Sequence, residues 1–113
     1  MKYGYQMEKF AAARSALMLP HHQPEGECIA AAFHACSLGM KDLDVMGLDD
    51  EGKRKIRILE TLMDTTGIQD PSGRGTWAIK AEQLTSDQKE ELSHVIDDLA
   101  AHFSMEFWSG SKS

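Results

Sequence analysis

The chain has 113 residues, of which 42% are hydrophobic, and its 18 Asp and Glu outnumber 12 Lys and Arg to give a formal net charge of −6. This length suits a single domain, residues 1–113, that buries about two-thirds of the surface its unfolded chain exposes. The negative charge argues against nucleic-acid binding and against docking on anionic membranes, because both need a basic surface.

The two cysteines and the start of the chain favour a cytoplasmic protein. Cys28 and Cys36 are eight residues apart in one predicted helix. A rise of ~1.5 Å per residue separates their Cα atoms by about 12 Å, which is too far for a disulfide. We therefore expect buried free thiols in a reducing compartment. The sequence shows neither the pattern of a signal peptide nor an apolar run of about 18 residues, the length that a membrane-spanning helix needs.

Residues 8–18 are rich in alanine, the residue with the highest helix propensity, and they predict the first helix. Phe10, Ala13 and Leu17 share one side of this helix. Pro20 ends it, because proline lacks the backbone N–H that a helix interior requires. The segment therefore offers one apolar side to a core.

The second predicted helix runs from about Glu25 to Val45 and is apolar on two faces. Its opposite face carries Ala31, Leu38 and Val45 at seven-residue spacing. Its main face contains Ile29, Ala32, Phe33, Cys36, Met40 and Leu43. A helix that is apolar on two sides must be covered on two sides, so we expect either the central helix of a bundle or one that also meets another subunit.

The third and the last predicted helices each begin at a capping residue and carry one apolar stripe. Asp49 or Asp50 caps the third helix, which runs to about Thr66. Thr85 and Gln88 form a capping box before the last helix. The stripe of the third helix contains Ile56, Leu59, Leu62 and Met63. The stripe of the last helix contains Leu92, Val95, Ile96, Leu99, Phe103 and Phe107.

Residues 2–7 and residues 76–81 alternate apolar residues with others, and this period of two residues is typical of a β-strand. Residues 70–75 contain Pro and Gly and predict a loop, and residues 76–81 follow it. The predicted fold class is mainly α, a four-helix antiparallel bundle with short connections. The pattern leaves open a short two-stranded β ribbon, residues 2–7 with 76–81. Small polar residues at 109–113 predict a frayed tail.

Apolar and aromatic residues remain after one core is built. Trp108 lies beyond the stripe of the last helix, and Leu38 and Val45 lie on the second face of the second helix. Arg74 stands between two glycines just before Trp77, where it would form an accessible recognition element. Surplus apolar surface often marks a subunit or partner contact. The leading hypothesis is a small interaction or regulatory module, a homodimer or a binder of another protein, that buries a helix face through Leu38, Val45 and Trp108. The loop residue Arg74 and the neighbouring Trp77 are a further expected partner contact.

Alternative functions would use polar residues. His21, His22 and Glu27 offer imidazole and carboxylate donors suited to zinc. With His34 they would line the mouth of a small-molecule- or metal-binding protein, with or without catalysis. Spaced signatures such as His-Glu-x-x-His and Cys-x-x-Cys are absent, so the sequence predicts no cofactor and assigns no catalytic residue. A basic run at residues 53–57 would suit a nucleic-acid regulator, but neighbouring acidic residues largely neutralise it.

Overall fold

The structure is a computed structural model that describes residues 3–18, 25–41, 43, 45–73 and 75–110. These residues form five α-helices and one short 3-10 helix: α1 (Gly4–Met18), α2 (Glu25–Met40), η1 (Val45–Gly47), α3 (Asp50–Met63), α4 (Thr76–Gln83) and α5 (Ser86–Gly110). No strand occurs in these described ranges. The prediction of a mainly α fold is confirmed, whereas the prediction of four helices is wrong because the chain forms a further helix, α4.

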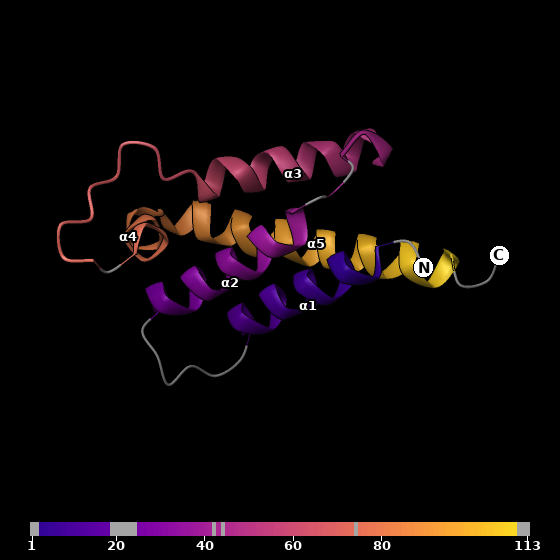
Figure 1. The fold of residues 1–113 in the computed structure, drawn as a ribbon, viewed down its shortest axis with the longest axis horizontal. Coiled ribbons are helices and arrows are strands. Elements are labelled where there is room, and N and C mark those ends of the chain that lie inside the picture. The colour runs from indigo at the N-terminus through magenta and orange to yellow at the C-terminus, as the bar shows by residue number, and fades with distance from the viewer. Residues whose placement is uncertain (1–2, 19–24, 42, 44, 74, 111–113) are drawn as a thin grey trace.

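The long helices run along the longest axis of the molecule, and α4 runs across it (Figure 1). α1 packs on α2 and on α5, α4 packs on α2, and α3 packs on α5. α5 has 25 residues, and at a rise of ~1.5 Å per residue it spans about 38 Å. The whole molecule is 50 Å long, so α5 is the scaffold that carries α1 on one side and α3 on the other (Figure 1).

Apolar side chains from all five helices form one buried cluster. The rings of Phe10 in α1 and Phe103 in α5 stack with their centroids 5.2 Å apart, and Phe33 in α2 is also fully buried. Burying a side chain of this size stabilises a fold by roughly 1.5–3 kcal/mol. The predicted stripes of α3 and α5 lie in this cluster, except for Phe107, which is half-buried.

The close packing of α1 on α2 depends on a glycine. A Cβ atom at Gly39 would lie 2.9 Å from Cε2 of Phe10 and 3.2 Å from Cβ of Lys9. Because the first of these distances is shorter than real Cβ contacts, the missing side chain lets the ring of Phe10 lie directly against the backbone of α2.

Two predicted helix starts are confirmed by their capping bonds. Oδ1 of Asp49 accepts the N–H of Gly52 at 2.7 Å, so Asp49 is the N-cap of α3. The N–H of Thr85 donates to Oε1 of Gln88 at 2.8 Å, and the N–H of Gln88 donates to Oγ1 of Thr85 at 3.1 Å. This reciprocal pair is a capping box before α5, and it satisfies backbone donors that have no partner inside the helix.

The prediction of a β ribbon is wrong, because both of its segments are helical where the structure describes them. Residues 4–7 belong to α1, which begins earlier than predicted, and residues 76–81 belong to α4. A short apolar run can satisfy the periods of both a strand and a helix, so packing decides between them. Both segments also carry core-packed residues at positions i, i+4 and i+7: Tyr3, Met7 and Phe10 in one, and Trp77, Ala81 and Leu84 in the other.

The prediction that the second helix reaches Val45 is also wrong. α2 ends at Met40, and the N–H of Lys41 is shared between the carbonyl oxygens of Ser37 at 3.1 Å and Leu38 at 3.3 Å, which tightens the final turn. Val45 begins η1 instead. Leu38 and Val45 therefore do not share one continuous helix face.

The remaining boundaries differ little from the prediction. α3 begins at Asp50 and ends at Met63, three residues before the predicted Thr66. α5 continues to Gly110 and so includes the first two residues of the segment 109–113. Within the part of the chain that the structure describes, none of the helices combines the length and the apolar composition that crossing a bilayer requires.

Candidate functional site

A groove of about 860 Å³ lies between α1 and α5 and is open to solvent. Its walls are formed mainly by small or apolar side chains. α1 contributes Gly4, Met7, Glu8, Ala11, Arg14 and Ser15. α5 contributes Ala100, Ala101, Ser104 and Phe107.

Helical spacing explains how α1 forms one wall of the groove. Gly4, Glu8, Ala11 and Ser15 recur at steps of four, three and four residues, so they lie on one face of the helix. Ala11 and Ser15 are exposed, and their short side chains leave the space above the helix open. At a rise of ~1.5 Å per residue, the wall from Gly4 to Ser15 is about 17 Å long, or roughly three helical turns.

The two ends of the groove differ in chemistry. A Cβ atom at Gly4 would lie 3.2 Å from Cε2 of Phe107, so this aromatic ring covers the first turn of α1. Toward the other end, Nε of Arg14 and Oδ1 of Asp97 form an ion pair at 2.6 Å that joins α1 to α5. Both side chains are 52% exposed, so the pair stabilises the fold by about 1 kcal/mol at most. It also neutralises charge beside the groove.

Trp108 extends the α5 wall beyond the groove. It follows Ala101 by seven residues, which is two helical turns, so it lies on the same side of α5. Its ring meets Phe107 edge-on with the centroids 5.1 Å apart, and 58% of the residue is exposed. Met105 is also an exposed apolar residue in this part of α5. Large apolar side chains therefore flank the small residues at one end of the groove.

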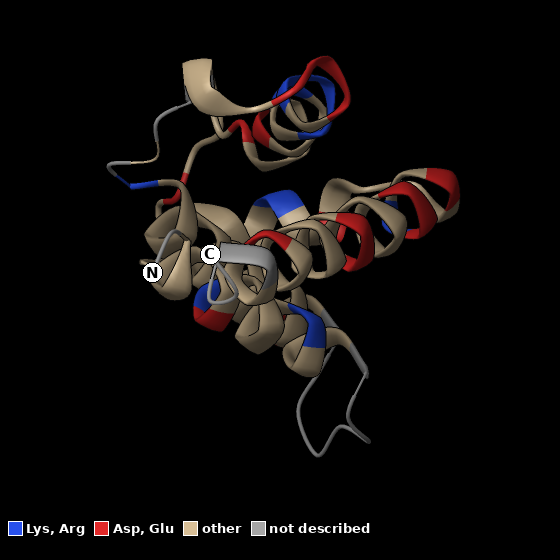
Figure 2. Ribbon diagram, turned by 90° about the vertical axis from the view of Figure 1, so that its right-hand side faces the viewer, with Lys and Arg blue, Asp and Glu red and all other residues tan. Residues whose placement is uncertain are grey.

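Charged residues are unevenly distributed over the molecule (Figure 2). Acidic residues follow the outer side of α5, and α3 carries residues of both signs. α1 and α2 are mostly uncharged. The groove thus lies where the surface changes from a charged to a weakly charged side.

Of the five predicted partner-binding residues, Leu38 and Trp77 lie away from the groove, and Arg74 and the side chain of Val45 are not among the described residues. Leu38 is half-buried on α2, and Trp77 is half-buried on α4, where it packs on the core and its ring meets that of His34 at 6.2 Å. Sequence reasoning missed the groove because alanine, serine and glycine produce no apolar stripe. The signal it overlooked is the recurrence of small residues at helical spacing in both α1 and α5.

The predicted metal donors are not brought together in the described structure. Glu27 and His34 are both exposed on α2, while His21 and His22 lie outside the described residues. Among the residues that the structure describes, no group of three or more His, Cys, Asp or Glu side chains is placed to hold a metal ion.

Cys28 and Cys36 are buried and form no disulfide, as predicted. Desolvation raises the pKa of the Cys36 thiol from 9.0 to about 12. Because the reactive form of a cysteine is the thiolate, this thiol is unreactive at neutral pH in the folded protein.

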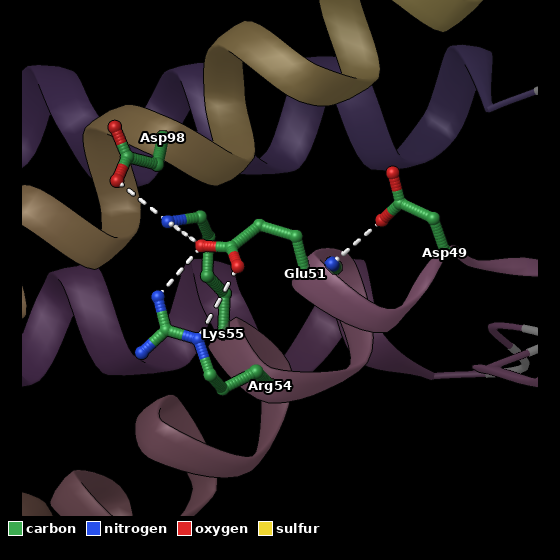
Figure 3. Close-up of polar contacts among 6 residues, drawn as sticks. Asp49, Glu51, Arg54, Lys55 and Asp98 are labelled. Atoms are coloured by element: carbon green, nitrogen blue, oxygen red, sulfur yellow. Dashed lines mark hydrogen bonds and ion pairs between the residues drawn. The ribbon is translucent and has the colours of Figure 1, made fainter.

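A network of ion pairs joins α3 to α5 (Figure 3). α3 and α1 lie on opposite sides of α5 (Figure 1). Nζ of Lys55 lies 2.9 Å from Oε1 of Glu51 and 2.9 Å from Oδ2 of Asp98, and Nη2 of Arg54 lies 2.6 Å from Oε1 of Glu51. Hydrogen bonds from Arg54 and then Lys55 lower the pKa of Glu51 from 4.5 to about 2. These contacts link α3 to α5, and they pair Arg54 and Lys55 of the basic run at residues 53–57 with acidic side chains.

No protein-family model matches this chain, and comparisons with curated proteins and with solved structures give no match either. The groove offers an elongated surface of mainly small and apolar residues, with Glu8 and Arg14 among its lining and the Arg14–Asp97 ion pair beside it.

Proposed function

We propose that this protein is an interaction module that binds a helix of a protein partner in the groove between α1 and α5. The observation that carries this proposal is the open groove itself, lined by small and apolar residues over about three helical turns. Laying an apolar helix face into such a groove is a recurrent mode of peptide and protein recognition. In this proposal the protein binds its partner by burying the apolar face of the partner helix in the groove.

The shape of the groove supports a helical partner. Packed helices lie 8–10 Å apart, and the distance depends on the side chains at the contact. Ala11, Ser15 and Ala101 are short and exposed, so a partner helix can approach to about the lower end of that range. Close approach of this kind increases the number of van der Waals contacts for each turn of helix.

The chemistry of the groove supports a protein partner. Interface centres are depleted of charged residues and enriched in aromatic ones, and Trp often contributes most to the binding energy. Trp108 and Phe107 stand at one end of the groove, and Arg14 at the other is already paired with Asp97. Two buried cysteines that form no disulfide fit a protein that works in a reducing compartment such as the cytoplasm.

The test compares two exposed alanines. Ala101→Arg places a long charged side chain in the groove, whereas Ala31→Arg makes the same change on α2, away from it. The tagged chain and both variants are expressed in the source cells, cross-linked and purified, and the cross-linked proteins, a second copy included, are quantified. We expect wild type and Ala31→Arg to retain the same partner and Ala101→Arg to retain less than about a tenth, because a buried unpaired charge costs several kcal/mol. Equal retention by both variants would refute the proposal.

A further inference from the structure

We infer that the helix bound in the groove is α1 of a second copy of this chain, packed antiparallel about a two-fold axis that passes beside Ala11. This inference rests on the proposed function and names its partner. It follows from the order of charge and size along the exposed face of α1.

The charges on this face are arranged symmetrically about Ala11. Glu8 lies three residues before it and Arg14 lies three residues after it, and both line the groove. When two identical helices pack antiparallel about a two-fold axis, a residue three positions before the axis lies level with the residue three positions after it in the other copy. Glu8 of each copy therefore lies level with Arg14 of the other, and this pairing occurs twice.

The sizes of the side chains follow the same symmetry. Met7, which is half-buried and packs on the core as well as lining the groove, lies four residues before Ala11, and Ser15 lies four residues after it. In the antiparallel pair a large side chain of one copy faces a small one of the other, which is how packed helices interdigitate. Ala11 lies on the axis, where its single methyl group lets the two backbones approach closely.

The charges needed for this pairing are accessible. The side chain of Glu8 is 72% exposed, and Nζ of Lys9 lies at the limit of ion-pair distance from it, at 4.0 Å. Arg14 is 52% exposed and uses Nε for Asp97. A guanidinium carries five N–H donors, so Arg14 can bind Asp97 and a second carboxylate at the same time.

Other arrangements of two α1 helices are less favourable. A parallel pair places Glu8 beside Glu8 and Arg14 beside Arg14, and an antiparallel pair centred on either residue places like charges on the axis. Like charges at a contact repel, whereas the register centred on Ala11 pairs opposite charges throughout. The sequence of the exposed face thus selects both the orientation and the register.

The decisive experiment is disulfide cross-linking at the axis. Ala11→Cys places two thiols face to face across the two-fold axis, whereas Ala12→Cys, also at an exposed alanine, points about 100° away around the helix. The native thiols are buried, so mild oxidation acts on the introduced cysteine. We expect Ala11→Cys to form a covalent dimer at micromolar concentration and Ala12→Cys to remain monomeric on a denaturing gel without reductant.

A charge reversal gives an independent readout by native mass spectrometry. Glu8→Arg turns two attractive pairs into repulsive ones, and we expect the dimer to weaken roughly tenfold because each pair is worth up to about a factor of five. Glu60→Arg, an equivalent change at an exposed position of α3, should leave it unchanged. Equal cross-linking of Ala11→Cys and Ala12→Cys, or a dimer unaffected by Glu8→Arg, would overturn the inference.

The outcomes separate this inference from the proposed function. If the wild type is monomeric but Ala101→Arg still abolishes binding of a different protein, the groove binds a helix of that protein. The inference that α1 of a second copy occupies the groove is then wrong. If the wild type is monomeric and Ala101→Arg changes no association, both proposals fail.

Discussion

Replacing Gly39 by alanine should destabilise the protein even though alanine favours helix. Gly39 lies within α2, and in an unconstrained helix interior the change to alanine stabilises by about 1 kcal/mol. Here the added Cβ would lie 2.9 Å from Cε2 and 3.2 Å from Cδ2 of Phe10. Phe10 is fully buried and stacked on Phe103, so its ring cannot move aside without disturbing the core.

The magnitude follows from these two opposing effects. Overpacking a well-filled core costs about 1–3 kcal/mol, which exceeds the gain in helix propensity of about 1 kcal/mol. We therefore expect Gly39→Ala to lower the free energy of unfolding by up to about 2 kcal/mol. Gly26→Ala, near the start of the same helix, is the matched control, because its Cβ would lie at an ordinary 3.5 Å from Cγ of Glu82. This control should be neutral or stabilising by up to about 1 kcal/mol.

Urea unfolding followed by circular dichroism at 222 nm measures both variants against wild type. Gly39→Ala should unfold at a lower urea concentration than Gly26→Ala with a similar slope. If Gly39→Ala were as stable as Gly26→Ala, α1 and α2 would not pack as closely as described, and the ring of Phe10 would not be held against the backbone of α2.

Three further predictions concern single side chains. The folded-state pKa of Glu51 is about 2, below its ordinary 4.5. Its ionised form therefore stabilises the fold above pH 4.5, and this contribution is lost as the pH falls through about 2. The stability difference between wild type and Glu51→Gln in urea should shrink over that window, whereas a difference independent of pH would contradict the ion-pair network. Thr85→Ala should cost about 1 kcal/mol by removing the capping box of α5, and Ser86→Ala should cost less; equal losses would argue against the cap. Cys36 should react with a thiol reagent at neutral pH only as fast as the protein unfolds, and rapid labelling of native protein would show that it is accessible.

The long helices and their starts were predictable because their signals are strong and local. α5 carries its apolar stripe over several turns and begins at a capping box, so period and cap agree. α3 begins after Asp49 for the same kind of reason, a short side chain that accepts a backbone N–H. Both features depend on residues close together in the chain.

The segments around Tyr3 and Trp77 were mispredicted because their structure depends on distant contacts. Each is short enough to fit a strand or a helix, and each becomes a helix by packing on the core. The groove was missed for a related reason. Residues such as Ala11 and Ala101 have no amphipathic signal, and they form a surface only once α1 lies along α5.

Sedimentation equilibrium of the untagged protein across micromolar concentrations tests most directly whether the α1/α5 groove holds a second copy. We predict a mass twice that of the chain for wild type and for Ala31→Glu, and the mass of one chain for Ala11→Glu, which places two carboxylates at the two-fold axis. A wild type that stays monomeric would contradict the inference that the groove binds a second copy of the chain. A dimer that survives Ala11→Glu but is lost in Leu38→Glu would place the interface on α2 instead of the groove.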